Sequence, residues 1–319
     1  MNNDYINPIR PNNFNEFIGQ ESVVSNLKIY IKASLLKDTS LDHTLLVGHA
    51  GTGKTSLAYI IAKELNQRII VINANSIEKT KDIIIALSKL NEGDILFIDE
   101  IHALKKNTEE VLYSAMEDFY INLNIKNDSK KEMIKYELPP FTLIGATTKI
   151  EEISKPLLDR FSITFNLVSY SYKDISKILF NIVNKLNFKY SSKALDTISS
   201  VSRLIPRLAI NYLKRINDYA IAENINYIDN EYVIKVLKNI GIKKYGLNDL
   251  DIKYLKMLHN EYHGKPVGIN TICSYLNESK KNIEEMVEKY LIEISFIRKT
   301  SKGRLITKKG ITYIYNLYK

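Results

Sequence analysis

The chain has little that would place it in a membrane or outside the cell. It contains one cysteine, Cys273, so an internal disulfide is excluded and a reducing compartment is expected. No run of about 18 apolar residues is present, so we predict no transmembrane helix. The N-terminal stretch is polar and lacks the apolar segment of a signal peptide. We therefore expect a cytoplasmic protein that is not attached to a membrane.

Charge is distributed unevenly along the chain. The net charge is +9, and residues 243–319 hold most of the excess, with 15 Lys and Arg against 8 Asp and Glu. From Arg298 onward there are seven basic residues and no acidic ones. Such a distribution indicates a polyanionic partner such as nucleic acid, but a solvated lysine-rich surface explains the charge equally well.

The order of apolar and polar segments predicts three domains. Short apolar runs separated mostly by helical stretches predict the buried strands of a parallel sheet, at residues 44–47, 69–72, 95–98, 141–145 and 163–167. Two alternating segments around a charged turn, within residues 120–138, predict a β-hairpin that is either an ordinary edge hairpin or a docking arm. Helical signals follow from about residue 170. We predict an α/β P-loop domain at 1–170, a small all-helical lid at 171–242 and a winged helix at 243–319.

The segment LVGHAGTGKTS, residues 46–56, contains the P-loop pattern G-x-x-x-x-G-K-T. It follows a predicted strand and opens a predicted helix, which is the context that the motif requires. Backbone N–H groups of the turn at Gly51 can surround phosphates, and Lys54 can reach the β- and γ-phosphates. The hydroxyl of Thr55 can ligate Mg²⁺. The sequence therefore predicts ATP and Mg²⁺ as ligands.

Polar residues follow several of the predicted strands. Asp99 and Glu100 end the strand in DILFIDEIH, and a parallel sheet places such an end beside the P-loop. We predict that Asp99 holds Mg²⁺ through water and that Glu100 polarises the attacking water. In LIGATT, either Thr147 or Thr148 positions that water.

Two arginines complete the predicted catalytic set. Arg160, in LLDRF, is placed to reach the nucleotide of a neighbouring subunit, where an arginine stabilises charge on the transferring phosphoryl group. On its own, an Asp-Arg pair is more often a surface ion pair. Arg207, in LIPRLA, is placed to touch the γ-phosphate and to link nucleotide state to domain rotation.

Taken together, these motifs resemble those of AAA+ ATPases and, more closely, those of the RuvB family of Holliday-junction branch-migration motors. The resemblance extends to YSAMEDF, LPPFTLIGATT, PLLDRF, GKPVGINTI and FIRKTSKGR, and it covers nearly the whole chain. It implies further nucleotide contacts at Ile9, Arg10, Ser56, Glu117, Asp118, Phe119 and Tyr170. It also implies contacts to double-stranded DNA by Lys299 and Arg304, with Arg298 and Lys302 as neighbours.

The resemblance implies partners as well. We expect a homo-hexameric ring on a Holliday junction, with hairpin 120–138 docking on a RuvA-like junction-binding protein and a RuvC-like resolvase as a further partner. The chain departs from the family pattern in four places. His49-Ala50 replaces two prolines, Leu158 an arginine, Leu204 a glycine and Lys299 an arginine.

Two other functions fit part of the sequence. A clamp-loader subunit is also an AAA+ ATPase that handles DNA, but such proteins usually end in a helical collar instead of a winged helix. A DNA-binding regulator would use ATP only as a conformational switch. Glu100 argues against the regulator, because a protein that does not hydrolyse ATP often lacks this base.

Overall fold

The computed structural model describes residues 9–127, 130–186 and 188–317. The chain divides into two compact units. The first comprises residues 1–187 with 205–207, and the second comprises residues 188–204 with 208–319. Among the helices of the described residues, none combines the length and the apolar character needed to cross a lipid bilayer.

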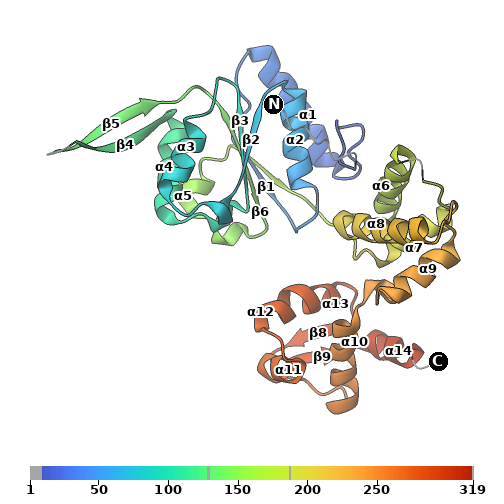
Figure 1. Cartoon of the computed structure of the whole chain (residues 1–319). Helices are drawn as coiled ribbons and strands as arrows, with labels where there is room; N and C mark the ends of the chain where they lie inside the picture. Colours follow the sequence, from blue (N-terminus) through green and yellow to red (C-terminus); the bar gives the residue numbers. More distant parts are fainter. Residues whose placement is uncertain (1–8, 128–129, 187, 318–319) are drawn as a thin grey trace. The chain divides into compact units, whose positions relative to one another are not determined.

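A five-stranded parallel sheet forms the centre of the first unit (Figure 1). The strands follow the order β2-β3-β6-β1-β7, with bounds Thr44–Val47 for β1, Ile69–Asn73 for β2, Ile95–Asp99 for β3, Thr142–Thr147 for β6 and Ile163–Asn166 for β7. The predicted parallel sheet is confirmed, with each strand within two residues of its expected ends. Because β1 lies between β6 and β7, the loop that follows β1 emerges beside the carboxyl end of β6.

Helices cover both faces of this sheet (Figure 1). The helices are α1 (Glu21–Lys37) and α2 (Lys54–Glu64) on one face, and α3 (Thr80–Leu87), α4 (Lys106–Glu117) and the short α5 (Lys155–Leu158) on the other. Neighbouring strand residues point to opposite faces. Leu46 therefore packs in the core under α1 and α2, and Leu45 packs in the core under α3 and α4.

A separate antiparallel hairpin lies between α4 and β6 in the chain, as predicted. Its strands are β4 (Tyr120–Asn127) and β5 (Lys130–Glu137), and turn residues 128–129 lie outside the described part. Ile121, at the base, is buried in the core below α4. The N–H of Leu138 donates to the carbonyl of Phe119 at 2.7 Å, which closes the base of the hairpin.

Helices follow the sheet, as the sequence predicts. Their bounds are α6 (Tyr172–Lys185) in the first unit, and α7 (Ser192–Val201), α8 (Pro206–Ala222) and α9 (Asn230–Asn239), of which α7, α9 and most of α8 belong to the second unit. Leu204, at the position where the resemblance implies a glycine, has a φ of 60°. It keeps the left-handed conformation that a glycine adopts without strain.

The C-terminal part is a winged helix, as predicted. Its elements are α10 (Asp249–Lys256), α11 (Ile269–Leu276), α12 (Lys280–Asn282), α13 (Lys289–Glu293), β8 (Ile297–Thr300), β9 (Gly303–Ile306) and α14 (Lys308–Asn316), with π-helical turns at Met257–Glu261 and Ile283–Glu288. Tyr254, Leu291 and Phe296 are buried in its core.

Within the second unit, Arg203 joins the end of α7 to the winged helix. Its guanidinium pairs with Asp251 on α10, donates to the carbonyl of Gly246 at 2.9 Å and lies 4.9 Å from the ring centre of Tyr290. The Asp251 side chain is fully buried, and Arg203 is 12% exposed. This buried ion pair therefore connects the end of α7 to α10 of the winged helix.

Some helices were not predicted, among them α1, α3 and α14. Helix α1 begins after Gln20, which has a φ of 57° and makes no side-chain cap. The usual Ser, Thr, Asp or Asn signal for a helix start is therefore missing from the sequence at this position.

Candidate nucleotide site and nucleic-acid surface

Tight backbone turns shape the P-loop between β1 and α2. Gly51 and Gly53 have φ values of 81° and 101°, in the region that favours glycine. A methyl group at Gly51 would lie 2.9 Å from side-chain carbons of Ile205 and Arg207, and one at Gly53 would lie 3.0 Å from the Phe17 ring. The loop thus needs glycine for its conformation and for close packing, as a phosphate-binding turn does.

Lys54, the first residue of α2, turns its side chain back into this loop. Its Nζ donates to the carbonyls of Gly48 at 2.7 Å and His49 at 3.1 Å, and the residue is 6% exposed. Burial lowers the pKa of Lys54, while the carboxylates of Glu100 and Asp99 act in the opposite direction. Anions are favoured at this helix N-terminus by the helix dipole and the first-turn N–H groups, which include those of Thr55 and Ser56.

Two carboxylates lie at the carboxyl end of β3. Asp99 is the last strand residue, and burial and the neighbouring Glu100 charge raise its pKa. Glu100 follows with φ 52° and ψ 44°, a left-handed conformation that is rare for glutamate. Its Oε2 accepts a hydrogen bond from the Thr148 hydroxyl at 3.1 Å.

The sequence left Thr147 and Thr148 as alternatives for positioning the attacking water, and the two residues have different surroundings in the structure. Thr147 is fully buried; its Oγ1 accepts from the Lys149 N–H at 2.9 Å and lies 3.0 Å from Nδ1 of His102. Thr148 is partly exposed and faces Glu100. Sequence reasoning missed His102, although it lies two residues after Glu100 in the same motif.

No cluster of three or more His, Cys, Asp or Glu in the described part of the chain could hold a metal ion alone. Mg²⁺ usually binds through one or two protein oxygens together with substrate phosphates. Thr55, in the first turn of α2, and Asp99, at the end of β3, carry oxygens of this kind.

Phe17, near the N-terminus, and Tyr170 both pack against the P-loop. The Tyr170 hydroxyl donates to the carbonyl of Thr52 at 3.1 Å, and burial raises its pKa. The Gln20 amide donates to and accepts from the backbone of Val168, at 2.7 Å and 3.0 Å. Gln20 therefore fixes this segment beside Tyr170, a role that sequence reasoning did not assign.

The remaining adenine-side candidates also belong to this unit. The Arg10 guanidinium lies 5.2 Å from the ring centre of Tyr59 on α2. The preceding residue, Ile9, is partly buried.

Arg160 and Glu117 lie together on the α4–α5 side of the sheet. Arg160 Nη2 donates to Glu117 Oε2 at 2.7 Å, and Nη1 donates to the Pro156 carbonyl at 2.7 Å. The guanidinium also lies 4.7 Å from the ring centre of Tyr113. The pair is thus on the sheet face opposite to α2. Asp118 caps the end of α4, and Phe119 follows with a φ of 52°.

The wing formed by β8 and β9 has two different faces. Lys299 pairs with Arg304 in register, and both side chains reach Glu288, whose side chain is fully buried. Arg304 is held most firmly: Nε donates to Glu288 Oε1 at 2.8 Å and Nη2 to Glu284 Oε1 at 2.8 Å. Arg298 and the turn residue Lys302 are exposed.

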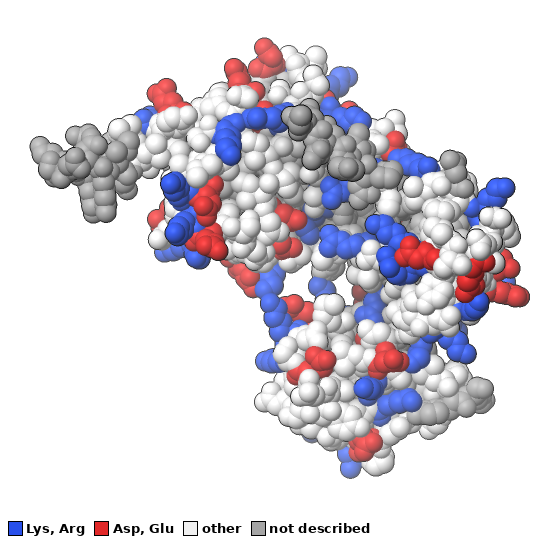
Figure 2. All heavy atoms as spheres, in the orientation of Figure 1, with Lys and Arg blue, Asp and Glu red and all other residues white. Residues whose placement is uncertain are grey.

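Acidic and basic side chains are mixed on the surface. On the face drawn in Figure 2, lysines and arginines alternate with aspartates and glutamates and do not form one continuous block.

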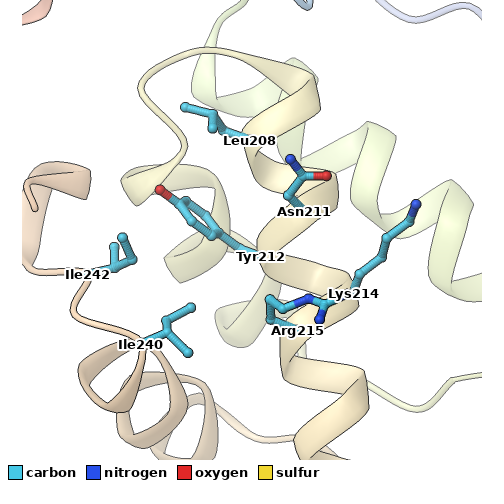
Figure 3. A pocket seen from close by; sticks show the side chains of 7 residues that line it. All are labelled: Leu208, Asn211, Tyr212, Lys214, Arg215, Ile240 and Ile242. Atoms are coloured by element: carbon cyan, nitrogen blue, oxygen red, sulfur yellow. The ribbon is translucent and has the colours of Figure 1, made fainter. Parts of the chain in front are cut away.

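One cavity of about 360 Å³ lies in the second unit, beside α8 (Figure 3). It is lined by side chains of α8 and by two isoleucines that follow α9, namely Leu208, Asn211, Tyr212, Lys214, Arg215, Ile240 and Ile242. Since no P-loop residue lines it, this cavity is distinct from the candidate nucleotide site.

The sheet carries a P-loop after β1, an Asp-Glu pair at the end of β3 and a polar end of β6. A helical lid and a winged helix follow it in the chain. These features define a P-loop ATPase. Family comparison agrees with this class. Residues 9–167 match the Holliday junction DNA helicase RuvB P-loop domain, residues 170–243 the RuvB AAA lid domain and residues 244–315 the RuvB C-terminal winged helix domain. The chain belongs to the RuvB family.

Individual relatives match over nearly the full length. The Holliday junction branch migration complex subunit RuvB of Mycoplasmopsis pulmonis is 44% identical over 306 residues, covering 96% of this chain and 97% of the relative. The protein with the same description from Orientia tsutsugamushi is 44% identical over 307 residues, covering 96% and 94%. The structure of the Thermotoga maritima RuvB Holliday junction branch migration motor matches with a TM-score of 0.83 at 36% identity, covering 97% and 98%.

The family assignment decides between the alternatives from the sequence. The predicted AAA+ fold and RuvB resemblance are confirmed. The C-terminal match to a winged helix removes the basis for the clamp-loader alternative, which required a helical collar.

Proposed function

We propose that this chain is the motor subunit that hydrolyses ATP to drive branch migration of Holliday junctions, because its relatives are named as a branch migration complex subunit and a branch migration motor. The observation that carries the proposal is the convergence of Lys54, Asp99, Glu100 and Thr148 at one sheet edge in a chain that also ends in a basic wing. Hydrolysis at this edge would supply the energy for moving duplex DNA through a ring of subunits.

Each residue at the sheet edge has a proposed role. Lys54, Gly51 and the α2 N-terminus, with Ser56 in its first turn, hold the ATP phosphates. Thr55 and Asp99 hold Mg²⁺, which neutralises phosphate charge when bound.

The polar residues beyond β3 and β6 act on the attacking water. Glu100 polarises the water. Thr148 also faces the water, a role supported by its hydrogen bond to Glu100 and by the burial of the alternative residue, Thr147.

Other residues are proposed to surround the nucleotide or to sense it. Arg160 acts on the ATP of a neighbouring subunit in a hexamer, where Glu117, Asp118 and Phe119 belong to the same contacting surface. The position of Arg160 on the α4–α5 face supports an action outside its own P-loop. Ile9, Arg10 and Tyr170 contact the adenine end, and Arg207 senses the γ-phosphate beside Gly51.

Four basic residues of the wing are proposed to act in binding duplex DNA. The exposed Arg298 and Lys302 bind duplex phosphates without reading sequence. Lys299, whose side chain is 47% exposed, and Arg304 are the DNA-contacting positions that the resemblance implies, and both pair with Glu288.

Hairpin 120–138 is proposed to dock on a RuvA-like junction-binding protein. The exposed apolar side chains Ile134 and Tyr136 on β5 support this role. A RuvC-like resolvase is proposed as a further partner. We also propose the domain bounds 1–170, 171–242 and 243–319, and a cytoplasmic location on the basis of cysteine content.

A branch-migration assay on a synthetic four-way junction tests the proposal, with and without a RuvA-like protein. Wild-type chain should convert the junction only when ATP and Mg²⁺ are present. Lys54→Ala should abolish conversion, and Arg160→Ala should abolish it while single subunits still bind nucleotide. Absence of conversion by the wild type in both settings, or undiminished conversion by Lys54→Ala, contradicts the proposal.

A further inference from the structure

His102 occupies a place beside Glu100 that the proposed mechanism has not used. It lies in a short 3₁₀ helix (Ile101–Ala103) that directly follows Glu100. Its side chain is 12% exposed. The imidazole is therefore held between β3 and the segment after β6, close to the residue that is proposed to polarise water.

The Nδ1 atom of His102 has two oxygen neighbours. It lies 3.0 Å from Oγ1 of Thr147 and 3.3 Å from Oε2 of Glu100. An ionised carboxylate only accepts hydrogen bonds, so an unprotonated Nδ1 lone pair facing it would be repelled. The contact with Glu100 therefore favours a hydrogen on Nδ1, with Thr147 Oγ1 as its hydrogen-bond acceptor.

The other side of the ring is also constrained. Nε2 lies 3.8 Å from Oε2 of Glu152, in the 3₁₀ turn after β6. Thr147 is itself fixed by the N–H of Lys149. The ring plane is thus set by groups from the β6 end, and its orientation depends on contacts other than the one to Glu100.

The consequence for Glu100 is that one of its oxygens has two polar neighbours. Oε2 receives the Thr148 hydroxyl at 3.1 Å and faces Nδ1–H of His102 at 3.3 Å. These two contacts restrain the carboxylate at Oε2, and we assign Oε1 as the oxygen that accepts a proton from water. Preorganisation of this kind raises the rate without changing substrate binding.

We propose that His102 is a positioning residue for ATP hydrolysis: its imidazole is anchored on Thr147 by a hydrogen bond and restrains Glu100 through the 3.3 Å contact of Nδ1 with Oε2. The inference rests on the proposed role of Glu100. It predicts that loss of the Nδ1 donor lowers kcat and leaves nucleotide binding intact, because the contacts of His102 are with Thr147, Glu100 and Glu152 and not with the P-loop.

The test compares steady-state ATP hydrolysis by the full chain with Mg²⁺ for the wild type, His102→Ala, His102→Asn and His102→Gln. The amide nitrogen of Asn reaches the place of Nδ1, whereas that of Gln reaches the place of Nε2. His102→Ala should lower kcat about 10- to 100-fold, the effect expected for losing a hydrogen bond to a charged group. KM and the affinity for a fluorescent ATP analogue should stay within about twofold.

Asn should restore most of the lost kcat, and Gln should not. His259→Ala is the matched control, because His259 lies beside the Tyr315 ring in the winged helix and should leave ATP turnover unchanged. The proposal is overturned if His102→Ala keeps kcat within twofold of wild type, if nucleotide affinity falls as far as kcat, or if Asn is as impaired as Ala. Wild type that turns over ATP without migrating junctions would refute the proposed function and leave this comparison valid.

Discussion

The buried pair of Arg203 and Asp251 allows a quantitative prediction about the second unit. Arg203→Ala removes the guanidinium that pairs with Asp251 and leaves a fully buried carboxylate, one of whose oxygens, Oδ1, has no hydrogen-bond partner among the described residues. Breaking a buried ion pair from one side typically costs about 3–5 kcal/mol. We expect a loss of this size near pH 8 in the free energy of opening of α10.

The loss should depend on pH in a defined direction. Burial raises the pKa of Asp251 above its ordinary value of 3.8, while Arg203 opposes this rise. A raised folded-state pKa means that Asp251 contributes most to stability below its unfolded pKa and that this contribution is lost as the pH rises through the folded-state value. Without Arg203 the pKa of Asp251 rises further, so the variant should be much less impaired at pH 5 than at pH 8.

Hydrogen–deuterium exchange of α10 and α13 peptides, corrected for intrinsic rates, measures these changes locally. Adding Asp251→Asn to Arg203→Ala removes the unpaired charge, so the double variant should recover part of the loss and lose its pH dependence. Arg215→Ala is the control, because Arg215 forms an exposed ion pair with Asp218 that should contribute less than about 1 kcal/mol. Equal losses at pH 5 and pH 8, or a double variant worse than the single one, would refute the reasoning.

Three further predictions concern backbone and wing. Leu204→Gly should be more stable than Leu204→Ala by about 1 kcal/mol in urea unfolding, because only glycine relieves the strain at a φ of 60°. Gly246→Ala should lower the thermal midpoint through a loss of about 2–3 kcal/mol, since its Cβ would overlap the Val201 carbonyl oxygen and its φ is 67°. Arg298→Ala and Lys302→Ala should each reduce the slope of log affinity against log salt for duplex DNA by about 1, whatever the sequence of the duplex.

The sequence predicted those parts of the fold whose signals are local. The strands that carry the P-loop and Asp99 are continuous apolar runs ended by chemically distinctive residues, so both their positions and their shared edge follow from the pattern. Helix α1 was missed because Gln20 starts it without a side-chain cap. Its buried residues Val23, Leu27 and Ile31 nevertheless recur every four positions, which is a helical signal.

Contacts between distant residues could not be predicted in the same way. His102 and Thr147 are 45 positions apart, and Arg203 and Asp251 are 48 apart, so no spacing rule relates them. The resemblance to the RuvB family implied a DNA contact for Arg304, and only the folded register of the wing shows that Glu288 holds this residue. Charge can be read from a sequence, whereas the partner of a charge depends on the fold.

The closed base of the β4–β5 hairpin has an evolutionary consequence. The chain leaves the core at Phe119 and returns at Leu138, two residues joined by a single backbone hydrogen bond. The two strands between them pair with each other and not with the five-stranded sheet. Their length and surface can therefore diverge among relatives, or be exchanged by grafting, while the alignment of β3 with β6 is preserved. Selection for a new binding partner can act on this insertion independently of selection on the ATP-hydrolysing machinery.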